Sequence, residues 1–267
     1  MGNGLYTFND VTLLITHYNR SASLERLLNA FNRLNCTFAE IIVSDDASKA
    51  DHFKRIQELQ DEYGFNLLIT HHNKGLGNNI NKGQDAVKTP YTLYVQEDFI
   101  PKDAFPEHFT DALQLMDENP ELDIARFYAY FKYPYLESFA KGFDRMKFKF
   151  WYPGYMKFYS YSDHPHLRRS TFFQKFGRYL EGVNGDKTEY NMCLSFLKNG
   201  GKGIFYHLFT TLFDQKNTSS EPSTADFRSS WTQRKNIFVR ILRKVYLQYK
   251  FLKFSWDYLF YPKITNE

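Results

Sequence analysis

Uninterrupted apolar runs alternate with segments whose apolar side chains recur every three or four positions along the first hundred residues. Such runs predict buried strands, and the recurring spacing predicts amphipathic helices. The predicted strands are 11–16, 40–45, 66–70 and 91–95. One predicted helix begins near Ser21 and Ser23, which are possible N-caps. A second predicted helix ends at Gly64, and a third covers 76–88.

Strands that alternate with helices imply a mostly parallel sheet with helices on its faces. We therefore predict an α/β fold of Rossmann-like type. In such sheets ligands bind beyond the carboxyl ends of the strands. Polar residues collect at three of these ends: Thr16 to Arg20, Asp45 with Asp46, and Glu97 with Asp98. We expect them to share one crevice.

Beyond residue 120 the pattern predicts a second group of elements. We expect a strand at 123–131, a helix within 168–181 that ends near Gly177, a helix at 189–201 and a strand at 203–213. Residues 214–226 have the composition of a loop or linker. A long amphipathic helix is predicted for 231–260. Its apolar stripe consists of Phe238, Ile241, Leu242, Val245, Tyr249, Leu252, Trp256 and Leu259.

Charge is distributed unevenly along the 267 residues. The net charge is +4, yet eight cations and no acid lie between Arg228 and Lys253. A basic amphipathic helix suits an anionic membrane surface; the alternative is that its stripe covers the main domain and its cations stay solvated. No nucleic-acid recognition motif accompanies the cations, so we expect no nucleic-acid partner.

Location is predicted from what the sequence lacks. Two cysteines provide no disulfide framework and fit a reducing compartment. The first ten residues have no secretory signal pattern, and no run approaches the ~20 apolar residues of a membrane span. We expect a cytoplasmic protein that is peripheral at the inner face of the cell membrane.

The strand-end residues suggest nucleotide chemistry. Oxygen ligands such as Glu97 and Asp98 suit Mg²⁺ or Mn²⁺, although an acidic pair alone also fits a solvated turn. Tyr18 could stack on a nucleobase, and Arg20 could pair with phosphate, with Asn19 between them. The stretch 73–83 is rich in Gly and Asn but has neither the GxGxxG nor the Walker spacing, which disfavours dinucleotide and P-loop chemistry.

Three ordered stretches, VTLLITHYNR, EIIVSDDAS and NKGLGNNINKGQDAVKTPYTLYVQEDF, together resemble the nucleotide-sugar-binding half of family 2 glycosyltransferases, which are inverting enzymes with a GT-A fold. The resemblance implies that Thr16, Tyr18 and Asp45 or Asp46 hold the nucleoside. It places QED at the Asp-x-Asp position, with Asp98 and Glu97 as metal ligands. The remaining donor-side candidates are Asn19, Arg20 and Asn73. Gln96 and Ile80 depart from the family pattern.

The later segment HLRRSTFFQKFGRYLEGVNGDKTEYNMCLSFLKNGGKGIFY is similar to the acceptor side of the same family. Counting back from Gly200 places Glu189 where the family has its catalytic Asp, with Asp186 as the rival. Inverting transfer needs a base that takes a proton from the acceptor hydroxyl.

We therefore expect a metal-dependent inverting glycosyltransferase. It would move a sugar from a nucleotide-sugar, a UDP-sugar first, to a glycan or lipid-linked saccharide in surface polysaccharide biosynthesis. The transferase domain is expected at 1–215, with a donor half at 1–100 and an acceptor half at 101–215, followed by a linker and basic helix at 216–267. Two alternatives remain open: a lapsed, non-catalytic nucleotide-sugar or glycan-binding module, and a nucleotidyltransferase.

Overall fold

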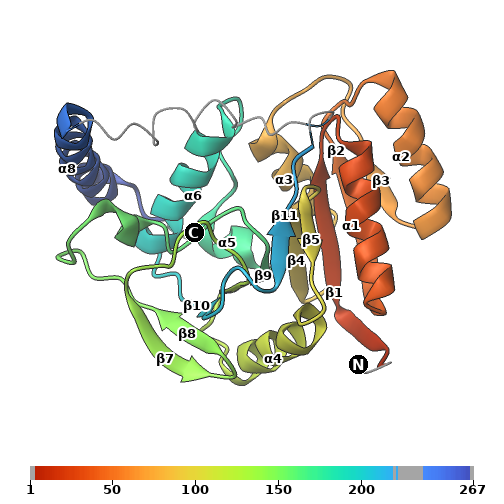
Figure 1. The fold of residues 1–267 in the computed structure, drawn as a ribbon, viewed down its shortest axis with the longest axis horizontal. Coiled ribbons are helices and arrows are strands. Elements are labelled where there is room, and N and C mark those ends of the chain that lie inside the picture. The colour runs from red at the N-terminus through yellow and green to blue at the C-terminus, as the bar shows by residue number, and fades with distance from the viewer. Residues whose placement is uncertain (1–3, 219–220, 222–236, 265–267) are drawn as a thin grey trace.

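The computed structural model describes residues 4–218, 221 and 237–264. Its centre is a nine-stranded sheet with the order β3-β2-β1-β4-β9-β6-β10-β8-β7 (Figure 1). The strands are β1 Tyr6–His17, β2 Cys36–Asp45, β3 Asn66–Leu68, β4 Tyr91–Gln96, β6 Ile124–Arg126, β7 Leu136–Ala140, β8 Phe143–Met146, β9 His166–Arg169 and β10 Gly203–Tyr206. A second, two-stranded sheet pairs β5 (Phe99–Pro101) with β11 (Phe213–Gln215).

The pairing confirms the predicted α/β architecture. Strands β3, β2, β1 and β4 are parallel to one another, and β6 and β10 run in the same direction. Strand β9 is antiparallel to both β4 and β6, and β8 is antiparallel to β10. The carboxyl ends of β1, β2 and β4 therefore meet at one edge of the sheet, as the strand-end residues led us to expect.

Helices cover both faces of this sheet. The helices are α1 Ser21–Arg33, α2 Ala50–Tyr63, α3 Leu76–Asp85, α4 Phe105–Glu118, α5 Phe172–Phe176, α6 Gly185–Lys198 and α8 Ile237–Phe260, with a 3-10 turn η1 at Tyr155–Phe158. Side chains alternate along β1, so Leu13 and Ile15 pack with α1, α2 and α4, whereas Leu14 packs with α3, α5 and α6. Two apolar layers thus enclose the sheet.

The glycines of α3 have a packing function. A Cβ at Gly77 would lie 2.3 Å from the carbonyl oxygen of Leu180, and one at Gly83 would lie 2.4 Å from Leu14 Cδ1. Gly64 ends α2 in the left-handed conformation at φ 68°, as predicted. The glycine-rich stretch therefore lets α3 approach its neighbours closely.

Several elements differ from the sequence prediction. The strand expected at 123–131 is only β6, and the strand expected at 203–213 divides into β10 and β11 with a turn between them. Much of the helix expected within 168–181 is instead strand β9 and the short α5. Helix α6 begins four residues earlier than predicted, so Asp186 occupies its first turn and Glu189 lies one turn further in.

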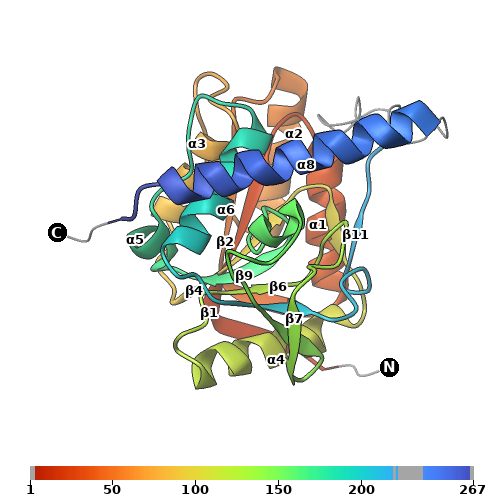
Figure 2. The same cartoon turned by 90° about the vertical axis from the view of Figure 1, so that its left-hand side faces the viewer.

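Helix α8 crosses the outside of α6 and packs on η1 (Figure 2). Phe254 is buried between them, in a cluster with Phe158, Leu194 and Leu197. The described members of the predicted stripe are all at least half exposed: Leu242, Val245, Tyr249, Leu252, Trp256 and Leu259. The stripe thus faces outward rather than covering the main domain; the side chains of Phe238 and Ile241 lie outside the described residues.

Candidate active site

Glu97 and Asp98 follow β4 and are both buried, with exposures of 8% and 3%. Burial, together with the neighbouring Asp98 charge, raises the pKa of Glu97 to about 8. Arg20 Nη1 lies 3.2 Å from Asp98 Oδ2 and 3.7 Å from Glu97 Oε1. The other carboxylate oxygen of Asp98, Oδ1, is buried without a hydrogen-bond partner. The guanidinium therefore neutralises this acidic pair only in part.

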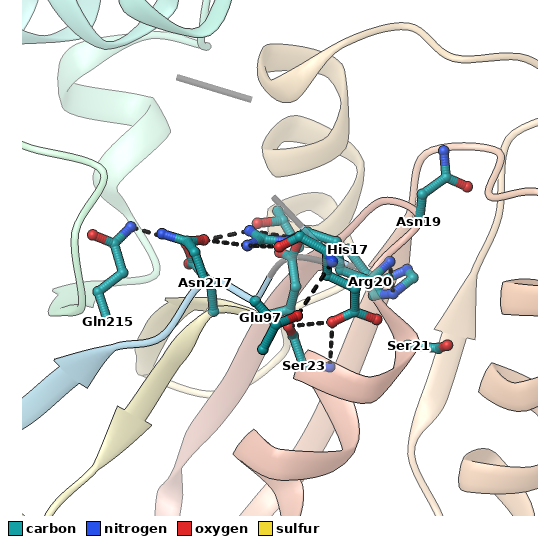
Figure 3. Close-up of polar contacts among 12 residues, drawn as sticks. His17, Asn19, Arg20, Ser21, Ser23, Glu97, Gln215 and Asn217 are labelled. Carbon is teal, nitrogen blue, oxygen red and sulfur yellow. Dashed lines mark hydrogen bonds and ion pairs between the residues drawn. The ribbon is translucent and has the colours of Figure 1, made fainter. Parts of the chain in front are cut away.

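The end of β11 and the segment that follows it contact the acidic pair and Arg20. Gln215 Nε2 donates to Asp98 Oδ2 at 2.9 Å, and Arg20 donates to the side chain of Asn217 and to the carbonyl of Glu221. Figure 3 shows Arg20, Glu97 and Asn217 gathered together, with Asn19 apart from them. Residues from three distant parts of the chain thus converge at the ends of β1 and β4.

Glu221 provides the N-terminal cap of α1. Its carboxylate accepts from the backbone N–H groups of Ala22 and Ser23, each at 2.9 Å, and from Ser23 Oγ at 2.5 Å. The predicted capping by the hydroxyls of Ser21 or Ser23 is therefore wrong, because α1 has no side-chain cap from its own N-cap residue. The sequence could not show this, since Glu221 lies about 200 residues away within an apparent linker.

The carboxylate of Asp45 is hydrogen-bonded to neighbouring protein groups. His17 Nδ1 lies 2.7 Å from Asp45 Oδ1, and His17 Nε2 accepts from the Arg20 backbone N–H. Because Nε2 accepts this hydrogen bond, Nδ1 is the nitrogen that donates to Asp45. Burial alone would raise the pKa of Asp45. The hydrogen bonds from His17 and Ser48 together have the larger effect, so the pKa of Asp45 is lowered.

Asp46 holds the loop that leads into α3. Its two carboxylate oxygens accept from the backbone N–H groups of Lys74 and Gly75, each at 2.8 Å. Asn73, in the same loop, is exposed. Across the described ranges no group of three or more His, Cys, Asp or Glu side chains forms a metal site. Asp45 and Asp46 are thus both engaged by protein groups, whereas Asp98 keeps one buried oxygen without a hydrogen-bond partner.

The three residues predicted around the nucleoside have different environments. Thr16 is buried, and its Oγ1 lies 3.0 Å from the hydroxyl of Tyr94. Tyr18 is 37% exposed at the end of β1. Asn19 has a φ of 54° and ties its turn to the next loop, because its backbone N–H donates to Ser48 and its side chain accepts from Lys49.

Glu189 lies in a large cavity on the other side of the site. The cavity has a volume of about 880 Å³ and is also lined by Asp186 and Ser162. Ser162 Oγ donates to Glu189 Oε1 at 2.8 Å, and the Asp163 backbone N–H donates to the same oxygen at 3.1 Å. Asp186 is exposed at the start of α6. The structure thus fixes the Glu189 carboxylate from the loop before β9.

Asp163 is a residue that the sequence analysis missed. It is buried, and burial together with the charge of Glu189 raises its pKa to about 8. Arg168 donates to the hydroxyl of Tyr179, which bonds to that of Tyr161, and Tyr161 donates to Asp163 Oδ1. The available signal was that Asp163 is the one acid between Asp144 and Glu181 in an aromatic-rich stretch.

Within the described part of the chain, every helix is too short or too polar to cross a membrane. The family model described as glycosyl transferase family 2 matches residues 12–179, which include the second half of β1, all of β4 and the loop that carries Asp163. The chain belongs to glycosyltransferase family 2. It has the α/β architecture of that family.

Solved structures of other glycosyltransferases share the fold. Residues 1–349 of S. aureus TarS in complex with UDP-GlcNAc match with a TM-score of 0.57 at 13% identity, covering 80% of this chain and 61% of that one. The same region crystallised without a named ligand gives 0.55 at 15% identity, with 76% and 59% covered. The mannosyltransferase PcManGT from Pyrobaculum calidifontis, in complex with GDP-Man and Mn²⁺, gives 0.51 at 12% identity, with 73% and 54% covered.

The chain spans about three fifths of the length of those TarS chains. No curated protein matches it in sequence. Helix α8 and the pocket wall that it forms lie beyond the residues that the family model matches. The features that distinguish this family member are therefore best sought in its C-terminal third.

Proposed function

We propose that this glycosyltransferase moves a sugar, with inversion, from a nucleotide-sugar to a hydroxyl of a glycan or lipid-linked saccharide in surface polysaccharide biosynthesis. A UDP-sugar is the first candidate donor. The observation that carries the proposal is that two acidic centres adjoin: Tyr130 lines the cavity of Glu189 and donates to Gln215, which in turn donates to Asp98. Glu97 and Asp98 offer ligands to a cation beside Arg20, and Glu189 lies in the adjoining cavity.

The donor side suits a nucleoside diphosphate. Tyr18 is exposed where a base could stack on it, and Arg20 presents a guanidinium for a phosphate. Thr16, Asn19, Asp45, Asp46 and Asn73 surround this edge as further donor-side candidates. The first four of these act by shaping the loops, since each is engaged with protein groups.

The acidic pair fits Mg²⁺ or Mn²⁺. Asp98 Oδ1 is a buried oxygen without a partner, and Glu97 is a second carboxylate beside it. Two carboxylates with further positions for phosphate oxygens are a usual arrangement for these hard ions. When bound, the cation would neutralise charge on the leaving diphosphate.

Glu189 is the proposed base. Both hydrogen bonds to its carboxylate engage Oε1, which leaves Oε2 to take the proton from the acceptor hydroxyl. The acceptor oxygen then forms a bond to the anomeric carbon as the bond to the diphosphate breaks, and the diphosphate leaves with the electron pair. Asp186 remains the rival for this role because it lines the same cavity.

Release of UDP or GDP from a panel of nucleotide-sugars, with and without Mn²⁺, tests the function. We expect release to depend on the metal. Glu189→Gln should lower the turnover rate by about 100-fold or more, and Asp186→Asn should lower it by less than about 10-fold. The reverse order would assign Asp186 as the base. Binding without release would indicate a lapsed module, and pyrophosphate formation from UTP would indicate a nucleotidyltransferase.

The outward stripe of α8 supports a peripheral site of action on the inner face of the cell membrane. Leu252 and Trp256 are each 65% exposed, and Arg243 and Lys244 lie exposed on the same helix. Apolar side chains flanked by cations bind anionic bilayers.

We expect flotation with phosphatidylglycerol vesicles to be lost in Trp256→Ser but kept in Trp151→Ser, which removes a 75% exposed tryptophan elsewhere. Equal flotation of both variants would contradict membrane contact through α8.

A further inference from the structure

Helix α8 lines the cavity that contains Glu189. Tyr246, Tyr249 and Phe254 face the cavity from this helix, and Glu189 faces it from α6. Phe254 is buried, whereas Tyr246 and Tyr249 are each more than half exposed. A side chain that lines a cavity and is also exposed lies at its mouth. The two tyrosines of α8 therefore form one side of the mouth.

Aromatic side chains also form another side of the mouth. Tyr130 and Phe131, which follow β6 in the chain, line the same cavity, and each is more than half exposed. Clustered exposed apolar side chains mark places where a protein contacts another surface, and aromatic rings are typical of the contact with a membrane. Two distant segments of the chain thus provide exposed rings around one opening.

The mouth adjoins the outer stripe of α8, because Tyr249 belongs to both. Leu252 and Trp256 follow Tyr249 at spacings of three and seven residues, so they continue the same side of the helix, and both are exposed. A surface that covers the stripe therefore reaches the mouth of the cavity as well.

The charges of α8 favour an anionic bilayer as that surface. Arg243 and Lys244 are exposed one to two turns before Tyr249 and do not line the cavity. Asp257 is the one acid in the sequence of α8, and it is paired with Lys253. An apolar stripe accompanied by exposed cations binds anionic lipid head groups.

We infer that the cavity opens onto the bilayer and that its acceptor is a saccharide anchored in the membrane by a lipid rather than a free glycan. The lipid stays in the bilayer beside the stripe, the aromatic mouth contacts the junction between lipid and saccharide, and the sugar enters toward Glu189. This inference rests on the proposed function, which identifies the cavity as the acceptor site.

Quenching by brominated lipids tests where the mouth lies. A fluorophore is attached at Phe131→Cys, since the native Cys36 and Cys193 are both buried. With phosphatidylglycerol vesicles, we expect brominated acyl chains to lower its emission about 2-fold or more, because interfacial side chains reach the acyl boundary. Leu252→Cys, on the stripe, should be quenched as well. Ile69→Cys is the control, because it is half exposed after β3, on the far side of the molecule from α8 (Figure 1).

Each other outcome of the quenching experiment contradicts the inference. Quenching at Leu252→Cys alone would show that the protein lies on the bilayer with the mouth turned away from it. No quenching at either position would show that α8 does not meet the bilayer. Equal quenching at Ile69→Cys would show that the protein adsorbs without a preferred face.

Alkyl glycosides test the class of acceptor. Calorimetry without donor or metal compares octyl with methyl β-glycosides of glucose, galactose and N-acetylglucosamine, below the micelle concentration. We expect the octyl member of at least one pair to bind about 10-fold or more tightly, because the burial of about two methylene groups accounts for that factor. The preference should fall below about 3-fold in Phe131→Ser, which removes an exposed ring of the mouth.

Ile69→Ser is the matched control and should keep the wild-type preference. Equal binding of the two members in every pair, or no binding at millimolar concentration, would overturn the inference. So would an undiminished preference in Phe131→Ser or an equal loss in the two variants, since the alkyl chain would then lie elsewhere. Neither experiment measures turnover, so both can succeed when the nucleotide-release assay fails, and the two failures are distinguishable.

Discussion

The guanidinium of Arg20 lies 3.2 Å from the carboxylate of Asp98, measured from Nη1 to Oδ2. These two side chains reach each other from the ends of adjacent strands, β1 and β4. Arg20 thus supplies positive charge at a place where the proposed cation would also supply it. The proposed donor side of the site is therefore held together by an ion pair with which a metal ion could compete.

Arg20→Gln should destabilise the protein in the absence of metal by about 3 kcal/mol, because a buried acidic pair loses its cation. The Tm increase on adding Mn²⁺ should be larger than in the wild type, since the ion then supplies the missing charge. Thermal unfolding with and without Mn²⁺ measures both effects. An unchanged Tm in EDTA would show that Arg20 does not stabilise the acids.

Glu221→Ala should lower the free energy of unfolding by about 1–2 kcal/mol, since the first N–H groups of α1 lose their cap. Asp214→Ala is the control, because its side chain is 65% exposed and pairs with Lys102 at the surface. It should change stability by less than about 0.5 kcal/mol. Urea unfolding of both variants measures the difference, and equal stabilities would show that Glu221 does not anchor α1.

Because of Asp163, the free energy of unfolding should decrease as the pH rises. Its folded pKa is about 8, whereas an unfolded Asp titrates near 4, so the folded protein keeps a proton that the unfolded chain releases between these values. Stability falls across this window by at most about 1.4 kcal/mol per pH unit from this group. Asp163→Asn should therefore lose less stability than the wild type between pH 6 and pH 8.

Urea unfolding at pH 6, 7 and 8 measures this difference. The pKa of Glu97 is also raised, but its contribution is common to both proteins and cancels in the comparison. Parallel pH profiles for the wild type and the Asn variant would show that Asp163 is ionised in the folded state at neutral pH.

Gly77→Ala should lower the free energy of unfolding by about 1–3 kcal/mol. The new Cβ would lie 2.3 Å from the Leu180 carbonyl oxygen, so the backbone must move to accommodate it. Gly185→Ala is the matched control, since its nearest neighbour, Leu76 Cδ2, lies at an ordinary 3.4 Å. It should leave stability unchanged or raise it by up to about 1 kcal/mol. Similar melting temperatures for the two variants would contradict close packing of α3 as the reason for its glycines.

The fold of the first hundred residues was predictable because its information is local. An apolar run followed by polar residues identifies a strand and its carboxyl end, and parallel strands bring such ends together. The pairing of β1 with β2 and β4 confirmed this reasoning. The capping of α1 was not predictable, because Glu221 comes from a segment with the composition of a linker.

The structure beyond residue 120 depended more on tertiary contacts. Asp163 became visible only when the loop before β9 was seen beside Glu189, since one acid among aromatic residues has no periodicity. The sequence identified the apolar stripe of α8, but it did not show whether the stripe faces the main domain or the solvent. Periodicity shows that a helix has two faces, and only the packing of Phe254 shows which face turns inward.

Calorimetric titration of UDP in the presence of Mn²⁺ tests the central claim most directly, namely that Glu97 and Asp98 hold a cation that carries a nucleotide diphosphate. The wild type should bind UDP with Mn²⁺ and much more weakly in EDTA, and Asp98→Asn should remove the metal-dependent part. Asp103→Asn, which changes an acid that is 82% exposed, should bind as the wild type does. Undiminished Mn²⁺-dependent binding by Asp98→Asn would contradict the account.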